Sequence, residues 1–170
     1  MKNLTAIPAF ISSLRIAILP LFLYLYNATN ITACLIVMAF CAATDFFDGY
    51  AARRLNATSR FGAYYDATTD FILIMGIFAI FYADRYYPIW LLLLISAAFI
   101  QFLATSFLAK KLYDPVGRYL GSALYIGVVL TLLWATPAVF TFVQYAFVAF
   151  FLVSLASRII SLTRKPAQAP

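Results

Sequence analysis

The sequence has few charged residues, and it lacks Glu and His entirely. Charged side chains make up 11% of the 170 residues, and the mean hydropathy is +0.94. A water-soluble domain carries roughly 25% charged residues, so the composition excludes one. Since each membrane-spanning helix needs about 20 apolar residues, six spans fill the chain and leave no room for a soluble domain. The sequence therefore predicts an all-α integral membrane protein that forms a single domain over residues 1–170.

Cysteine is also scarce, with only Cys34 and Cys41. Seven residues apart in one apolar run, they share a helix face two turns apart, beyond disulfide reach, and we expect them to be packing residues. The N-terminal segment lacks an Ala-x-Ala cleavage site, and Arg15 interrupts its apolar stretch. We therefore expect a retained first helix rather than a signal peptide.

Acidic residues are half as frequent as basic ones, which gives a net charge of +6. Such a surplus suits nucleic acid, anionic lipid head groups or phosphorylated substrates, and the long aliphatic runs exclude nucleic acid. Hydropathy predicts six spans, at 7–26, 31–52, 62–82, 88–108, 119–134 and 138–160.

The basic residues lie on one side of this predicted membrane map, apart from Arg85. That side holds Lys2, Arg15, Arg53, Arg54, Arg60, Lys110, Lys111, Arg118, Arg158, Arg164 and Lys165. The positive-inside rule then places both termini in the cytoplasm. The opposite side holds Tyr86, Tyr87, Trp90 and Trp134, which are typical of an aromatic belt at the outer interface.

Four of the six acids lie inside the second and third apolar spans, where an ionised carboxylate costs several kcal/mol. Asp45 and Asp48 are three residues apart, and Asp66 and Asp70 are four apart, so each pair shares one helix face. The two helices run antiparallel across a short cytoplasmic turn. The four carboxylates therefore are predicted to converge in one cavity that opens to the cytoplasm.

Four like charges in one cavity would stay protonated unless cations neutralise them. Oxygen ligands without His indicate hard divalent metals, Mg²⁺ or Mn²⁺, and the number of carboxylates favours two metals that clamp phosphate oxygens. Phosphoryl transfer is the chemistry implied. Two alternatives remain at this stage: an ion or proton relay in a transporter, and structural salt bridges to Arg53, Arg54 or Arg60.

Small residues accompany these acids: Gly49, Ala52 and Gly62. They would let a ligand approach the backbone, but they are equally typical of close helix packing in membranes. Arg15 likewise has two interpretations, as a partner for a phosphate group or as a side chain that snorkels to the cytoplasmic head groups.

The pattern Asp45-x2-Asp48-Gly49-x2-Ala52-Arg53-x8-Gly62-x3-Asp66-x3-Asp70 resembles the signature of the CDP-alcohol phosphatidyltransferase family at every fixed position. The resemblance implies an integral membrane enzyme with six transmembrane helices and cytoplasmic termini, usually a homodimer. Such an enzyme transfers the phosphatidyl group of CDP-diacylglycerol, a CDP-linked lipid, to an alcohol in phospholipid biosynthesis and releases CMP. One position departs from the family: many members have Asn-x2-Thr-x2-Arg early in the first helix, and this chain has Ala9-x2-Ser12-x2-Arg15.

The resemblance also implies roles for the signature residues. Asp45, Asp48 and Asp66 would bind the two divalent cations, and Asp70 would combine metal contact with the role of general base. The CDP group would be lined by Gly49, Ala52, Arg53 and Gly62. We further expect a bacterial inner-membrane protein whose active site faces the cytoplasm.

The acceptor alcohol is predicted from basic residues outside the signature. Arg118 and Arg158 resemble arginines that bind an acceptor phosphate in family members, and guanidinium groups suit a phosphate monoester. Lys110 and Lys111 are further candidates, although the positive-inside bias alone explains them. We expect glycerol 3-phosphate as acceptor, then inositol phosphate, and then an unphosphorylated alcohol such as serine, inositol or phosphatidylglycerol.

Overall fold

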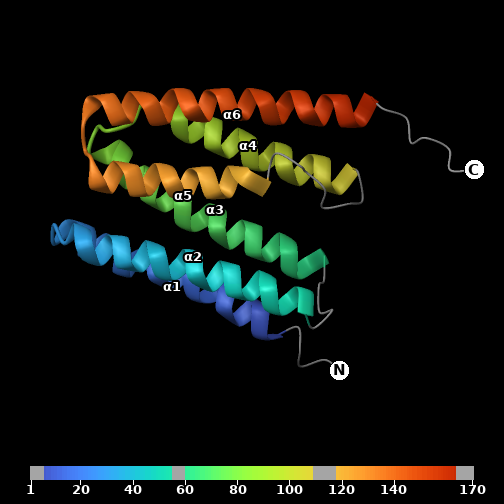
Figure 1. Cartoon of the computed structure of the whole chain (residues 1–170), viewed down its shortest axis with the longest axis horizontal. Coiled ribbons are helices and arrows are strands. Elements are labelled where there is room, and N and C mark those ends of the chain that lie inside the picture. The colour runs from blue at the N-terminus through green and yellow to red at the C-terminus, as the bar shows by residue number, and fades with distance from the viewer. Residues whose placement is uncertain (1–5, 55–59, 109–117, 164–170) are drawn as a thin grey trace, which may run out of the picture.

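The computed structural model describes residues 6–54, 60–108 and 118–163, with side chains described for most of 15–44, 64–104 and 121–157 and a few residues beside these ranges. Within these residues the chain forms six helices and no strand (Figure 1). The helices are α1 (Ala6–Asn27), α2 (Ile31–Arg54), α3 (Arg60–Ala83), α4 (Ile89–Leu108), α5 (Arg118–Leu133) and α6 (Pro137–Thr163). Each boundary lies within three residues of the predicted one, so the all-α prediction is confirmed.

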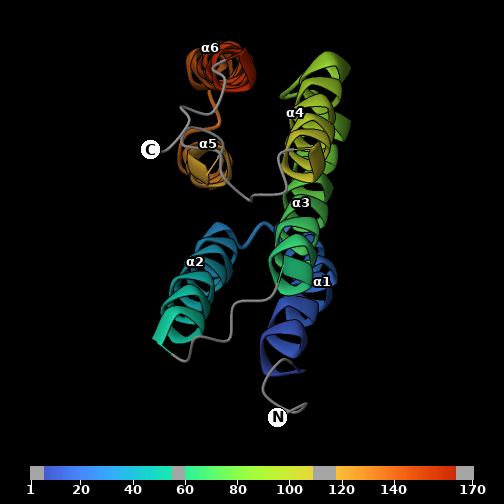
Figure 2. The ribbon, with the colours of Figure 1, turned by 90° about the vertical axis from the view of Figure 1, so that its right-hand side faces the viewer.

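The helices form two layers that run roughly parallel to one another. In Figure 2, α1, α3 and α4 lie in one layer and α2, α5 and α6 lie in the other. Helix α3 is central, since it contacts α1, α4 and α5. The chain alternates direction, so α1, α3 and α5 start at one end of the bundle, where α2, α4 and α6 finish (Figure 1). We call this the acid end, and the opposite end, which holds residues 28–30, 84–88 and 134–136, the turn end.

Two of the tight turns at the turn end use left-handed residues that are not glycine. Thr29 has φ 55° after α1, and Arg85 has φ 63° after α3. In both cases the next amide bonds five residues back, Asn30 N to Leu25 O and Tyr86 N to Phe81 O, each within 3.0 Å. These bonds satisfy the last carbonyls of each helix in a Schellman arrangement. Both helices therefore end sharply, and the chain reverses at once.

A close approach fixes how α1 lies on α3. A Cβ atom added to Gly76 of α3 would lie 2.5 Å from Leu19 Cδ2 of α1. Because glycine has no side chain, it lets the two helices meet at this point. The contact fixes the register of the pair between the acid end and the turn end.

Aromatic side chains fill the core near the turn end. Phe78 and Phe81 are fully buried and pack edge to face, with ring centroids 5.9 Å apart. Tyr87 is also buried, and its hydroxyl lies 2.6 Å from the Thr131 hydroxyl. The assignment of Tyr87 to an aromatic belt is therefore wrong: the ring packs inward because Thr131 supplies a buried partner for its hydroxyl. Trp90 and Trp134 are exposed at this end, as predicted.

Two helical segments among the described side chains are long and apolar enough to cross a membrane, Tyr64–Ala83 and Pro137–Ser157. Four shorter apolar segments come from the other helices: Arg15–Asn27, Ile31–Thr44, Ile89–Ala104 and Gly121–Leu133. Large apolar side chains such as Leu93, Ile100 and Phe142 are exposed on the outside of the bundle. Such a surface is that of a membrane protein.

Candidate active site at the acid end

Two of the predicted site residues lie on one face of α3. Asp66 and Asp70 are one helical turn apart, and their side chains are 38% and 27% exposed. Both contact the same group, the guanidinium of Arg15 on α1. The Arg15 Nη1 donates to Asp66 Oδ1 at 2.8 Å and also to Asp70 Oδ1. Arg15 therefore meets two carboxylates that lie 51 and 55 positions later in the chain. We call this charged cluster of Arg15, Asp66 and Asp70 the acid site.

Arg15 itself is buried, with 1% of its side chain exposed. A guanidinium enclosed in this way does not snorkel to the lipid head groups, so that interpretation is contradicted. The structural ion pair weighed from the sequence involved Arg53, Arg54 or Arg60, whereas the partner seen here comes from the first helix. No pattern in the local sequence indicates that a residue of α1 pairs with residues of α3.

Among the described side chains, Thr69 of α3 and Cys41 of α2 lie near the acid site. Thr69 is buried, and its hydroxyl donates to the Asp66 carbonyl oxygen at 2.8 Å. Cys41 of α2 is fully buried within electrostatic range of Arg15 and Asp70. Cys34 is buried too, and both cysteines are free thiols, which confirms their prediction as packing residues.

The structure describes less of the other predicted site residues. The backbones of Asp45, Asp48, Gly49, Ala52 and Arg53 lie on α2, in its half toward the acid end, but their side chains lie outside the described ones. Gly62 lies in the first turn of α3, as expected. Arg118 begins α5 and Arg158 lies in the last third of α6, again without described side chains, and Lys110 and Lys111 lie outside the described residues.

The donor atoms of the acid site fit a hard divalent cation. Asp66 and Asp70 offer carboxylate oxygens on one helix face, both partly exposed and both already drawn to a positive group. Mg²⁺ is commonly bound through one or two protein carboxylates and retains waters or substrate phosphates. Among the described side chains no group of three acidic, His or Cys ligands occurs. The described half of the signature thus supplies one carboxylate pair.

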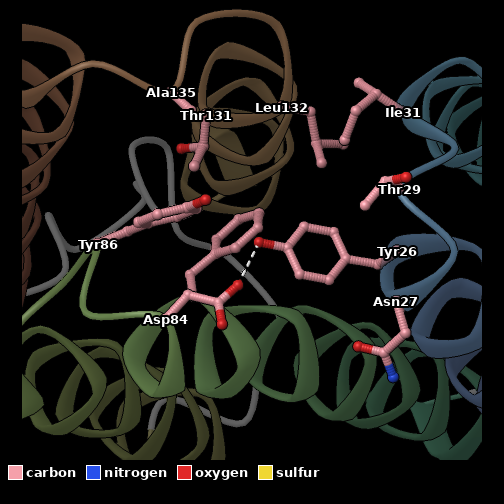
Figure 3. A pocket seen from close by; sticks show the side chains of 10 residues that line it. Tyr26, Asn27, Thr29, Ile31, Asp84, Tyr86, Thr131, Leu132 and Ala135 are labelled. Carbon is pink, nitrogen blue, oxygen red and sulfur yellow. Dashed lines mark hydrogen bonds between the residues drawn. The ribbon is translucent and has the colours of Figure 1, made fainter.

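A separate cavity lies at the turn end, the opposite end of the bundle from the acid site. Its volume is about 310 Å³, and Figure 3 shows the side chains that line it, which come from α1, α2, α3 and α5 and the adjoining turns. Tyr26 Oη donates to Asp84 Oδ2 at 2.5 Å, and Tyr86 points into the same space. With one carboxylate, this cavity lacks the paired acids that phosphate chemistry through metals requires.

The comparisons with known proteins agree with the signature. The family model described as CDP-alcohol phosphatidyltransferase matches residues 5–165. The chain belongs to this family. Its curated relatives include a protein of Escherichia coli (strain K12), 28% identical over 157 residues, which covers 87% of this chain and 86% of the relative. No solved structure matches.

Two further phosphatidyltransferase relatives match a shorter part of the chain. A protein of Yersinia enterocolitica is 34% identical and one of Pectobacterium atrosepticum 32% identical, each over 90 residues. The match covers 51% of this chain and about half (49%) of each relative's length. All three relatives carry the name CDP-diacylglycerol–glycerol-3-phosphate 3-phosphatidyltransferase.

Proposed function

We propose that this protein transfers the phosphatidyl group of CDP-diacylglycerol to glycerol 3-phosphate and releases CMP. The observation that carries the proposal is the acid site, in which two signature carboxylates share one face of α3 and bind a common positive group. The name of the relatives supports the donor and the acceptor. Family membership supports the type of reaction.

In this reaction an acceptor hydroxyl attacks the lipid-side phosphorus, and the bond from that phosphorus to CMP breaks. Asp70 accepts the proton of the hydroxyl as the general base. Asp45, Asp48 and Asp66 would hold two divalent cations, Mg²⁺ or Mn²⁺, with Asp70 as a further ligand. When bound, these cations neutralise the pyrophosphate charge and stabilise the leaving group. Gly49, Ala52, Arg53 and Gly62 would line the CDP group.

The acceptor site would be built from the acid-end basic residues. Arg118 starts α5 and Arg158 lies on α6, and both helices present these ends toward the acid end (Figure 1). Guanidinium groups bind a phosphate monoester through paired hydrogen bonds, which favours glycerol 3-phosphate over a neutral alcohol. Lys110 and Lys111 would contribute positive charge around the same site.

The proposal includes a membrane arrangement. All six helices would cross a bacterial inner membrane, with both termini and the acid end in the cytoplasm, and two copies would form a homodimer. The support is the distribution of basic residues, which leaves Arg85 alone at the turn end. A reporter fused after Pro170 should then report the cytoplasm, and one inserted at Asp84 the exterior.

The test is an assay of CMP release by the purified protein. CDP-diacylglycerol is supplied with Mg²⁺, with Mn²⁺ or with EDTA, together with glycerol 3-phosphate, inositol phosphate, serine or inositol in separate reactions. We expect release that needs the metal and is fastest with glycerol 3-phosphate. No CMP release with any acceptor would contradict the proposed reaction, and faster release with an unphosphorylated alcohol would contradict the acceptor.

The acceptor residues have their own control in the same assay. Arg118→Ala and Arg158→Ala should each raise the KM for glycerol 3-phosphate while the KM for CDP-diacylglycerol changes little. Lys110→Ala serves as the matched charge deletion, with a smaller effect expected. Unchanged acceptor KM in both arginine variants would leave membrane topology as the explanation for these residues.

A further inference from the structure

The position of Arg15 in the acid site is determined by the packing of α1 on α3. Arg15, Leu19 and Tyr26 are spaced four and seven residues apart, so they lie along one face of α1. Each contacts α3 or the turn directly after it: Arg15 at Asp66 and Asp70, Leu19 at Gly76, and Tyr26 at Asp84. Three contacts along the same face fix the register, so the guanidinium points at the two carboxylates.

Arg15 balances negative charge on α3. Asp66 and Asp70 are four residues apart, a spacing at which like charges repel on a helix. Arg15 is the only charged residue of α1 and is 1% exposed, so its own charge also needs a partner. The ion pairs reduce the repulsion between the two carboxylates and also give the buried guanidinium its partners, because one guanidinium nitrogen contacts one oxygen of each carboxylate.

The same two carboxylates are the ones that the proposed function gives to divalent metal. A metal that binds them lies close to the buried guanidinium of Arg15, which is within hydrogen-bond distance of both carboxylates, and the two cations repel each other. Linkage requires the effect to be mutual: whatever favours the ion pairs disfavours the metal, and metal binding weakens the ion pairs.

We propose that Arg15 is a built-in counter-cation of the acid site, which pairs with Asp66 and Asp70 and competes with divalent metal for them. This inference rests on the metal site of the proposed function. It concerns binding rather than turnover, so it stands or falls independently of which substrates the enzyme uses. Through these ion pairs the arginine also joins α1 to α3 at the acid end.

The test measures Mn²⁺ binding to the full chain in detergent after treatment with EDTA and removal of the chelator. Removing the competing charge in Arg15→Gln should tighten Mn²⁺ binding by about tenfold or more, the scale on which groups around metal ligands act. Thermal unfolding in EDTA should occur at a lower temperature than in the wild type, and added Mn²⁺ should raise it by more. Arg85→Gln, an equal charge deletion at the turn end, should match the wild type in both measurements.

A second measurement uses the wild-type protein, so it does not depend on the folding of a variant. The guanidinium nitrogens are labelled with ¹⁵N and followed by NMR during a Mg²⁺ titration, with Arg15→Lys used to assign the Arg15 signal. We expect the Arg15 signal to shift as the metal binds, while the Arg85 signal stays unchanged. An Arg15 signal that ignores Mg²⁺, or an Arg15→Gln protein that is folded and binds Mn²⁺ no more tightly than the wild type, would overturn the proposal.

Discussion

The two ends of the α1–α3 pair are joined by different chemistry. At the acid end, a buried guanidinium contacts two carboxylates of α3. At the turn end, the Tyr26 hydroxyl donates to Asp84, and this contact is exposed. Both ends thus use an aspartate on the α3 side, but only the acid end brings together two carboxylates and a full positive charge.

The energies at the two ends differ accordingly. Removing one partner from a buried ion pair costs about 3–5 kcal/mol, and the partial exposure of Asp66 and Asp70 reduces that cost here. A single hydrogen bond contributes about 0.5–1.5 kcal/mol, and less when water can replace the partner, as at Asp84. Changes at the acid end should therefore affect both ligand binding and stability, and changes at the turn end should affect stability alone.

The largest expected effect is on donor binding at the acid end. Gly49→Leu and Ala52→Leu should each abolish measurable binding of CDP-diacylglycerol, because the new side chain would fill space that the proposed function gives to the nucleotide. Gly121→Leu is the control, since a Cβ atom at Gly121 meets nothing within 4 Å. Binding is measured with a labelled donor in detergent. Normal affinity in the folded Gly49→Leu and Ala52→Leu proteins would show that these small residues serve helix packing.

The next largest effect is expected where α1 contacts α3, between the acid end and the turn end. Gly76→Leu should destabilise the protein by about 1–3 kcal/mol, because its side chain overlaps the Leu19 side chain, so that Leu19 or α1 itself must shift. Combining it with Leu19→Ala should restore part of the loss, since the second change frees the space. Thermal unfolding in detergent measures both. A Gly76→Leu protein as stable as the wild type would mean that α1 and α3 do not approach closely here.

The smallest effects are expected at the turn end. The Thr131 hydroxyl donates to the Gly127 carbonyl at 2.7 Å, so the Tyr87 hydroxyl is the donor in the pair that they form. Tyr87→Phe should cost about 1 kcal/mol, because a buried hydrogen bond is lost. Tyr26→Phe, at the exposed contact, should cost less. Equal losses of stability would contradict the difference in burial between the two hydroxyls.

The helices could be predicted from the sequence because each is an apolar run about as long as a membrane span, and short polar segments separate the runs. The pairing of Asp66 with Asp70 could also be predicted, since a spacing of four places both on one helix face. The partner of the pair could not. Arg15 is more than 50 residues away, and its contact depends on the register of α1 on α3, which Gly76 and Leu19 set through shape. A single glycine in an apolar run carries no sign of which helix it will meet.

At the turn end, too, one contact could not be predicted from the sequence. The sequence predicts one aromatic belt made of Tyr86, Tyr87, Trp90 and Trp134, and the two tryptophans are exposed as such a belt requires. Tyr87 is buried instead, because Thr131 of α5 provides a hydroxyl at the required depth. Burial raises the pKa of the Tyr87 hydroxyl, because removal from water disfavours the charged phenolate. Hydropathy alone cannot separate a tyrosine that faces the interface from one that finds a buried partner.

The most direct test of the account compares two aspartates at opposite ends of α3. CMP release from CDP-diacylglycerol is measured with Mg²⁺ and glycerol 3-phosphate for the wild type, Asp70→Asn and Asp84→Asn. We predict that Asp70→Asn lowers turnover by about 10²–10⁴-fold, the usual contribution of a general base, while CDP-diacylglycerol binding stays near normal. Asp84→Asn should keep the turnover of the wild type. An equal loss in both variants, or full turnover in Asp70→Asn, would contradict the assignment of the chemistry to the acid end.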